Sequence, residues 1–273
     1  MTLYISAQII GIITYSKTKA IILWYLLQML GRILNSLLDI IAPHTCQICG
    51  RIADNYLCQD CTQGINLIND GFCTVCGIPF ISKASFSHVC GACIKKKPKF
   101  TSARSIGIYE GVLMDAVHKL KYNGKTSLAK PLGMIMAEKL SLAFCREKHA
   151  FHPLASLIVP IPLHKKRLKE RGFNQSLLLA REIAKRHNIK MDYLNFKRVR
   201  WTEPQINLKG DERLKNVRGA FLVKDAQVFK KMRILLIDDV YTTGATVMEC
   251  SKVLKKAGAK DVYVLTLARV CRV

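Results

Sequence analysis

The segment R-I-L-L-I-D-D-V-Y-T-T-G-A-T-V, residues 233–247, decides the fold of this chain. It begins with a continuous apolar run, 234–237, which is typical of a strand covered on both faces in a parallel sheet. From Val247 onward the apolar residues recur at helical spacing, and lysines followed by Gly258 indicate the end of that helix. Residues 242–246 therefore connect the carboxyl end of a strand to the amino end of a helix.

We expect this connection to bind a phosphorylated sugar. The free N–H groups and the dipole at a helix N-terminus attract a phosphate, and threonine hydroxyls add further donors. Asp238 and Asp239 precede the connection, where they can accept hydrogen bonds from two vicinal hydroxyls of a sugar. A 5-phosphorylated ribose satisfies both requirements. The alternative is an ordinary strand–turn–helix corner with two solvated aspartates. A P-loop is a poorer fit because its glycine and lysine pattern is missing from the sequence.

The run L-L-I-D-D-V-Y-T-T-G-A-T resembles the phosphoribosyl-pyrophosphate (PRPP) loop of type I phosphoribosyltransferases. In that family two acids contact the ribose hydroxyls, and the backbone of the loop holds the 5-phosphate. The resemblance implies ribose contacts at Asp238 and Asp239. It implies a phosphate site at Thr242, Thr243, Gly244, Ala245 and Thr246.

A second segment, V-P-I-P-L-H-K-K-R-L-K-E-R-G-F-N-Q-S at 159–176, suits a pyrophosphate. An apolar strand is followed by six potentially cationic residues, which are His164, Lys165, Lys166, Arg167, Lys169 and Arg171. Arginine offers paired donors, and lysine offers a mobile point charge. Gly172 gives the segment a place to bend, so we expect a closing loop. The alternative is a solvated run of charges.

Eight of the eleven cysteines form four C-x-x-C pairs, which predict about two structural Zn²⁺ ions. A C-x-x-C turn directs two thiolates at one point, and a following glycine, as at Gly50 and Gly77, permits a tight turn. Disulfides would need an oxidising compartment, and no export signal stands out. The simplest grouping places Cys46, Cys49, Cys58 and Cys61 in one site and Cys73, Cys76, Cys90 and Cys93 in the other. An interleaved grouping, the first pair with the third and the second with the fourth, stays open.

The net charge of +24, from 43 basic and 19 acidic residues, indicates anionic partners such as phosphates, nucleic acid or a membrane surface. Residues 1–43 form an apolar extension, but no unbroken run reaches the ~20 residues that span a bilayer. From about Leu26 apolar residues recur at helical spacing, so we expect an amphipathic helix packed on a neighbour, with peripheral membrane contact as the alternative. We expect a cytoplasmic protein, either free or at the inner face of the membrane.

Strands and helices alternate after the cysteine pairs, which predicts the α/β class with a parallel sheet flanked by helices. Ligands of such sheets bind at the carboxyl ends of the strands, where the acid pair lies. The expected strands are 102–109, 157–162, 233–237 and 262–268, and the expected helices are 113–122, 125–144, 176–185 and 247–254. We divide the chain into the extension at 1–43, a double zinc-ribbon module at 44–98 and a phosphoribosyltransferase-like domain at 99–273.

The C-x-x-C pairs, P-L-H-x-x-R-x-x-x-R-G-F-N-Q and D-D-V-x-T-T-G-A-T, in this order, resemble the competence-protein-F-like family. The resemblance extends from about Leu34 to Arg269 and includes L-K-Y at 120–122. That family joins a zinc module to a type I phosphoribosyltransferase domain and is linked in several bacteria to DNA uptake and use. It implies a pyrophosphate and flexible-loop region that contains His164, Arg167, Arg171, Asn174 and Gln175.

Two functions follow. In the first, the protein is a glycosyltransferase of the phosphoribosyltransferase type, which binds PRPP with Mg²⁺ and lets a nucleophile displace pyrophosphate; the sequence identifies neither the acceptor nor a catalytic base. In the second, it is a non-catalytic, zinc-containing factor that binds single-stranded DNA, with PRPP as a regulatory ligand. Both functions make the DNA-uptake machinery an expected partner. The sequence does not determine the oligomeric state.

Overall fold

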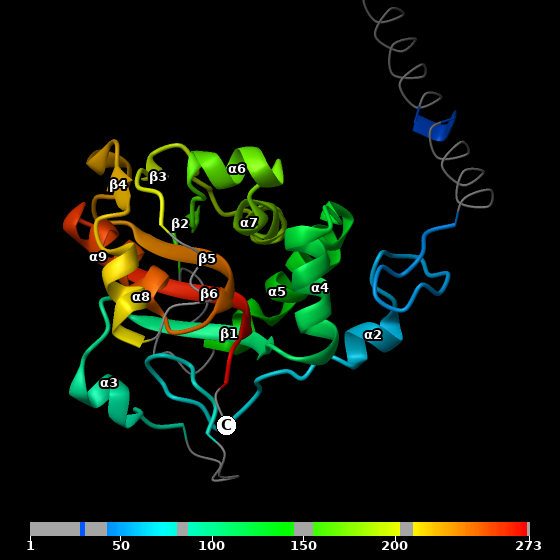
Figure 1. The fold of residues 1–273 in the computed structure, drawn as a ribbon, viewed down its shortest axis with the longest axis horizontal. Coiled ribbons are helices and arrows are strands. Elements are labelled where there is room, and N and C mark those ends of the chain that lie inside the picture. Colours follow the sequence, from blue (N-terminus) through cyan, green and yellow to red (C-terminus); the bar gives the residue numbers. More distant parts are fainter. Residues whose placement is uncertain (1–27, 31–42, 81–86, 145–154, 203–209, 272–273) are drawn as a thin grey trace, which may run out of the picture.

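The computed structural model describes residues 28–30, 43–80, 87–144, 155–202 and 210–271. Its centre is a four-stranded sheet in the order β1-β6-β5-β2, in which all neighbouring strands are parallel (Figure 1). These strands are β1 (Ser102–Ile108), β2 (Leu157–Pro160), β5 (Arg233–Tyr241) and β6 (Asp261–Arg269). The predicted α/β class with a parallel sheet is confirmed.

Helices cover both faces of this sheet. The first face packs against α4 (Gly111–Tyr122), α5 (Ala129–Phe144) and α7 (Gln175–His187) and receives Leu235 and Ile237 of β5. The second face packs against α9 (Ala245–Lys256) and receives Ile234 and Leu236. Because successive side chains of a strand point to opposite faces, the continuous apolar run of β5 is what a strand covered on both sides requires.

Smaller elements surround this core. A second, two-stranded sheet pairs β3 (Phe196–Arg198) with β4 (Phe221–Val223) in antiparallel orientation, and α8 (Gly210–Val217), which lies between them in the sequence, packs on α9. The helix α6 (Lys165–Arg171) follows β2, and the 3-10 turns are η1 (Thr126–Leu128) and η3 (Ala226–Val228). The cysteine-rich part contributes two short helices, α2 (Gln59–Gln63) and α3 (Gly91–Lys95).

The two halves of the cysteine-rich part pack on opposite faces of the sheet. Cys46 and Cys61 belong to the apolar cluster of the first face, together with Leu113 of α4. Cys73 and Cys93 belong to the cluster of the second face. In Figure 1, α2 accordingly lies on the side of α4, and α3 lies at the other end of the molecule. The cysteine pairs therefore extend the core of the α/β domain on both sides.

Within residues 233–247, two element boundaries differ from the prediction. β5 continues past the apolar run to Tyr241, which pairs in register with Arg269 of β6, so the acid pair lies within the strand. The connection is also shorter, because α9 begins at Ala245 and only residues 242–244 form the turn. Pairing with β6 explains the longer strand, since each added residue gains a partner in the ladder.

Among the described residues, no helix is both long enough and apolar enough to span a bilayer. The predicted amphipathic helix lies outside the described residues, except for 28–30, which are helical and exposed.

Candidate functional site

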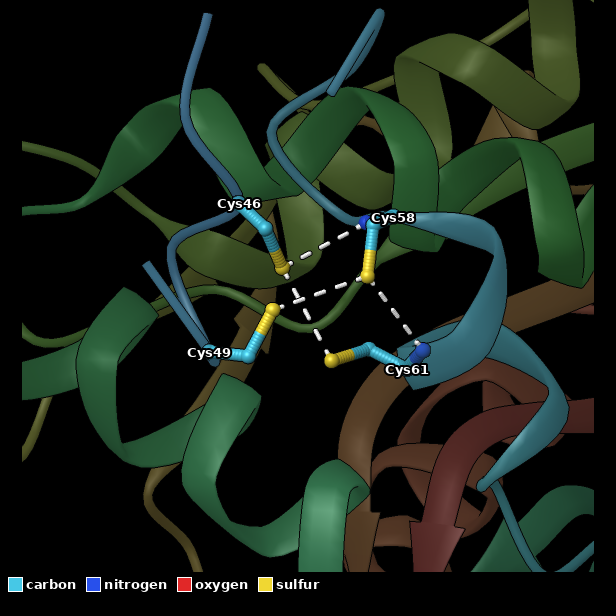
Figure 2. A group of neighbouring side chains, drawn as sticks. All are labelled: Cys46, Cys49, Cys58 and Cys61. Carbon is cyan, nitrogen blue, oxygen red and sulfur yellow. Dashed lines mark hydrogen bonds between the residues drawn. The ribbon is translucent and has the colours of Figure 1, made fainter. Parts of the chain in front are cut away.

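The first four cysteines bring their sulfur atoms together at one point (Figure 2). All four sulfurs lie within 4.8 Å of one another. The Sγ–Sγ distance is 3.8 Å between Cys46 and Cys61 and 3.7 Å between Cys49 and Cys58. A tetrahedral zinc ion with Zn–S bonds of about 2.3 Å holds its sulfurs about 3.8 Å apart. This cluster therefore has the dimensions of a zinc site closed by four thiolates.

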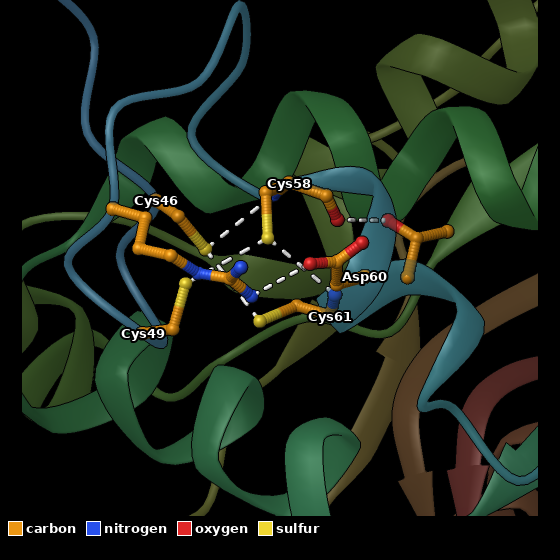
Figure 3. A network of polar contacts seen from close by, with 7 residues as sticks. Cys46, Cys49, Cys58, Asp60 and Cys61 are labelled. Carbon is orange, nitrogen blue, oxygen red and sulfur yellow. Dashed lines mark hydrogen bonds and ion pairs between the residues drawn. The ribbon is translucent and has the colours of Figure 1, made fainter.

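Backbone donors and a charged pair surround the first cluster (Figure 3). The N–H of Cys58 donates to the sulfur of Cys46 at 3.4 Å. Arg51 forms an ion pair with Asp60 at 2.7 Å, and both side chains are exposed. Hydrogen bonds from the backbone and side chain of Arg51 lower the pKa of Cys49 to about 6. Because zinc binds the thiolate, these donors favour the form of the ligand that the metal requires.

The other four cysteines form a second cluster, whose sulfurs also lie within 4.8 Å of one another. Cys76 and Cys90 are 3.8 Å apart at their sulfurs, and both donate their backbone N–H to the sulfur of Cys73, at 3.4 and 3.3 Å. Cys93 completes the set. Neighbouring pairs along the chain therefore share each site, and the interleaved grouping does not occur.

Glycines close both metal turns, as the sequence predicts. Gly50 and Gly77 adopt positive φ angles of 75° and 73°, which side chains rarely tolerate. A Cβ on Gly77 would also overlap the carbonyl oxygen of Ala103 in β1. The second cluster is thus held directly against the sheet.

The acid pair lies at the carboxyl end of β5 in two different environments. The hydroxyl of Ser176, in the first turn of α7, donates to Asp238 at 2.8 Å. The ammonium of Lys121, in α4, lies 2.5 Å from Asp239. Burial and the charge of Asp239 raise the pKa of Asp238 to about 7, although Lys121 and Ser176 act in the opposite direction. Burial disfavours the charged form of Lys121, but Asp239 outweighs burial and raises the pKa of this lysine.

The predicted phosphate segment consists of a turn and the first residues of α9. Gly244 adopts a φ of 80° and is the N-cap of the helix, so Ala245 and Thr246 are helical rather than part of the turn. The first N–H groups of any helix lack an acceptor within it; that of Ala245 makes one long bond, 3.5 Å, to the hydroxyl of Thr243. Thr242 and Thr246 line the same cavity as the acid pair.

The cationic segment is a helix rather than the closing loop that we expected. His164 is the N-cap of α6, and its Nδ1 accepts from the N–H of Lys166 at 3.3 Å. The helix ends at Gly172, whose φ of 81° is left-handed. A histidine cap at one end and a left-handed glycine at the other give the seven residues between them a defined start and stop.

Helical spacing separates the predicted cations into two groups. His164, Arg167 and Arg171 line the cavity, because residues three and four apart share one face of a helix. Lys165 and Lys166 are exposed and are not part of the cavity lining.

Asn174 and Gln175 have different positions. Asn174 is the N-cap of α7, where its Oδ1 accepts from the N–H of Ser176 at 3.0 Å and its Nδ2 donates to the carbonyl of Ile161 at 3.0 Å. Gln175 lines the cavity, and its Oε1 accepts from Arg171 at 2.6 Å. Asn174 therefore fixes the backbone, while Gln175 orients a cavity arginine.

The helix α4 and the segment 198–202 contribute residues that we did not predict as site residues. Lys121 and Tyr122 belong to the L-K-Y run, which the family resemblance flagged without assigning a role. Arg198 of β3 is half-buried and donates to the hydroxyl of Thr202, and Trp201 lies between them in sequence. Arg198 belongs to no motif that could have placed it here.

One cavity of about 730 Å³ lies at the carboxyl ends of the central strands. Its lining includes Asp238, Asp239, Thr242, Thr246, His164, Arg167, Arg171, Gln175, Lys121, Tyr122, Arg198, Trp201 and Thr202. This volume is within the range of small-molecule sites. Besides the two aspartates, four cationic side chains line it, namely Lys121, Arg167, Arg171 and Arg198. The excess of positive charge favours an anionic ligand.

A family model described as "Double zinc ribbon domain" matches residues 37–94. Competence protein F of Haemophilus influenzae is 28% identical over 226 residues, which cover 79% of this chain and 97% of that protein. DNA utilization protein YhgH of Salmonella typhi is 30% identical over 224 residues, which cover 78% of this chain and 96% of that protein. The chain belongs to the competence-protein-F-like family.

This membership includes both the ribbon and the sheet, since Competence protein ComFC of Streptococcus pneumoniae is 31% identical over 218 residues, 79% of this chain and 89% of that protein. Among solved structures, the APRTase of Giardia lamblia with 9-deazaadenine is 15% identical, covers 63% of this chain and 78% of that one, and has a TM-score of 0.34. That similarity is too low to support a conclusion about this competence-protein-F-like chain.

Proposed function

We propose that the protein binds PRPP together with Mg²⁺ in the cavity at the carboxyl ends of its central strands. The single observation that supports this most is that Asp238, Asp239 and the first turn of α9 line one cavity. The acid pair accepts hydrogen bonds from the two ribose hydroxyls. The turn at 242–244 and the N–H groups that follow it hold the 5-phosphate.

The cationic face of α6 receives the pyrophosphate. Arg167 and Arg171 supply paired N–H donors, and His164 adds a third group on the same face. Gln175 restrains Arg171 through its 2.6 Å bond. A carboxylate such as that of Asp238 would hold Mg²⁺, since Mg²⁺ prefers such oxygen ligands, and the ion would neutralise part of the charge of PRPP.

The reaction that fits this site is ribosyl transfer. The bond between C1 of the ribose and the pyrophosphate oxygen breaks, a bond from C1 to the acceptor nucleophile forms, and the acceptor loses a proton. The residues of this chain contribute by fixing the sugar and by neutralising the departing pyrophosphate. Arg167, Arg171 and Lys121 carry the charges for that second task.

In the cell, we infer a role in the use of incoming DNA, because relatives bear the names competence protein F and DNA utilization protein. Two clusters of four thiol ligands each persist in a reducing compartment, which supports a cytoplasmic location beside the DNA-uptake machinery.

A non-catalytic role in binding single-stranded DNA is the second candidate. Its support is the ring of Trp201 at the rim of the cavity, which lies 4.8 Å from Nζ of Lys166 and 5.5 Å from Cζ of Arg167. Aromatic rings beside cations are suited to stacked bases and backbone phosphates. In this role PRPP is a regulatory ligand.

Two measurements distinguish the candidates. Calorimetry with PRPP and Mg²⁺ tests binding, and detection of released pyrophosphate across a panel of acceptors tests transfer. PRPP binding with pyrophosphate release supports the enzyme. DNA binding that falls steeply with salt, without pyrophosphate release, supports the second role. Absence of PRPP binding to the zinc-loaded protein contradicts both.

A further inference from the structure

A buried arginine connects the second cysteine cluster to the sheet. Arg269 is the last residue of β6 and is only 5% exposed. Its Nη1 donates to the carbonyl oxygen of Cys76 at 2.7 Å, and its Nη2 lies 3.9 Å from the sulfur of the same cysteine. Four thiolates around Zn²⁺ carry two net negative charges, so this guanidinium is placed as their counter-ion. A buried arginine without such a partner would be costly.

The same guanidinium contacts Tyr241 at the end of β5. Its Cζ lies 4.1 Å from the centre of the Tyr241 ring, and the two residues are paired in register across the strands β5 and β6. Tyr241 is 6% exposed. An aromatic face attracts a cation, so the arginine and the ring hold each other in place.

Tyr241 in turn lies against the phosphate turn. A Cβ on Gly244 would overlap the Tyr241 hydroxyl, so this hydroxyl occupies the space directly beside the glycine. Gly244 is the N-cap of α9, and its carbonyl accepts the N–H of Met248 at 2.9 Å. The position of the Tyr241 side chain therefore determines where the turn and the start of α9 can lie.

We propose that Arg269 and Tyr241 are positioning residues that make the geometry of the phosphate turn depend on zinc in the second cluster. With zinc bound, the thiolates hold Arg269, which holds Tyr241 beside Gly244. Without zinc, the C-x-x-C turn that carries the Cys76 carbonyl is no longer held by the metal, so the 2.7 Å bond from Arg269 to that carbonyl and the contact of Arg269 with Tyr241 loosen. The role of the turn in phosphate binding rests on the proposed function. The series of contacts from Cys76 through Arg269 and Tyr241 to Gly244 does not.

The first cluster provides a matched comparison. Its arginine, Arg51, contacts Cys49 as Arg269 contacts Cys76, but it is exposed and paired with Asp60 within the same ribbon. Removing Arg51 therefore removes a cation from a thiolate cluster without disturbing Tyr241.

The test measures hydrogen exchange of the backbone N–H groups of residues 242–248 in the full chain, without PRPP, together with the zinc content of each variant. The variants are Arg269→Met, Tyr241→Phe and the control Arg51→Met. Arg269→Met should accelerate exchange in this segment by about 10- to 100-fold and release zinc from the second cluster more readily. Tyr241→Phe should accelerate exchange in the segment with two zinc ions retained. Arg51→Met should leave the segment unchanged.

The proposal is overturned if Tyr241→Phe exchanges as the wild type does, or if Arg51→Met accelerates the segment as much as Arg269→Met. If Arg269→Met does not fold, the comparison of Tyr241→Phe with the wild type still decides. Calorimetry with PRPP and Mg²⁺ is then run on the same samples. If the wild type does not bind PRPP, the proposed function is overturned. The exchange data still test whether Arg269 and Tyr241 position the turn.

Discussion

The ammonium of Lys121 lies 2.5 Å from the carboxylate of Asp239, and the two side chains are only 18% and 5% exposed. A buried charge that loses its partner costs far more than an exposed pair contributes. We therefore predict that Lys121→Met destabilises the fold by about 2 kcal/mol or more. Urea denaturation measures this change. Lys130→Met, at an exposed position in α5, is the control and should change stability by less than about 0.5 kcal/mol.

Replacing both Asp238 and Asp239 should remove the proposed hydrogen bonds to the ribose hydroxyls. Each charge-assisted hydrogen bond contributes roughly 1.5–3 kcal/mol, so Asp238→Asn with Asp239→Asn should weaken PRPP binding by about a hundredfold or more. Calorimetry with Mg²⁺ measures the affinity, and circular dichroism checks the fold. Asp115→Asn, on the exposed side of α4, should bind as the wild type does. Equal affinity of the double variant and the wild type would remove the acid pair from the site.

The raised pKa of Asp238, about 7, predicts that PRPP binding depends on pH. Only the ionised carboxylate accepts hydrogen bonds at both oxygens, so affinity should increase as the pH rises through about 7. Affinity measured at about pH 6 and about pH 8 should differ several-fold in the wild type and much less in Asp238→Asn. A wild-type affinity that is flat across this range would contradict the raised pKa.

The same pKa affects stability in the opposite direction. The folded state holds the Asp238 proton more tightly than the unfolded chain, in which the pKa of an aspartate is about 3.9. The stabilising contribution of this group is fully present below that value and is lost as the pH rises through about 7. Asp238→Asn should therefore flatten the decline of the unfolding free energy between about pH 4 and about pH 7, as measured by urea denaturation at each pH.

Gly244→Val should be more damaging than Thr243→Val. In the proposed site, a branched side chain at Gly244 would obstruct the approach of the backbone to the phosphate. The structure shows a second obstacle, which acts even without ligand. A Cβ at Gly244 would overlap the Tyr241 hydroxyl, and the φ of 80° is strained for valine. We expect Gly244→Val to cost about 2 kcal/mol or more in stability. Thr243 is exposed, so Thr243→Val should change stability by less than about 0.5 kcal/mol while it weakens phosphate binding modestly.

Each cysteine cluster should hold its own zinc ion. Metal analysis of the purified protein should give about two zinc ions per chain, with release when thiols are blocked. Cys61→Ser and Cys93→Ser should each leave one ion and unfold the ribbon concerned, which limited proteolysis would detect. The sheet should persist in both variants. A disulfide between Cys46 and Cys49 in protein kept from oxidation would contradict the metal assignment.

The parts of the molecule that could be predicted from sequence are those determined by local spacing. The run 233–247 predicts a strand, a turn and a helix because its apolar residues change period within a few positions. The cysteine clusters also follow from spacing, since a C-x-x-C turn is a local structure. The choice between consecutive and interleaved grouping depends on tertiary contacts, and only the structure resolves it.

The full lining of the cavity could not be predicted from local spacing. Lys121 and Arg198 lie far from Asp239 in the sequence, and only the packing of α4 and β3 around the sheet brings them to one site. The helix α6 could have been predicted, because the spacing of His164, Arg167 and Arg171 is helical. Gly172 after it indicated a loop instead, and a short charged helix has little apolar signal to oppose that interpretation.

The order of the strands has a consequence for how the chain folds during synthesis. β6 follows the other three strands of the sheet along the chain, yet it lies between β1 and β5 and is the partner through which β1 joins them. The ribosome therefore releases both cysteine ribbons, β1 and most of the apolar helices before the strand that unites them exists. Contacts between segments so distant form slowly. Until β6 emerges, metal binding is what gives the ribbons a defined structure, and the edges of β1 and β5 that β6 will join carry unpaired backbone N–H and C=O groups.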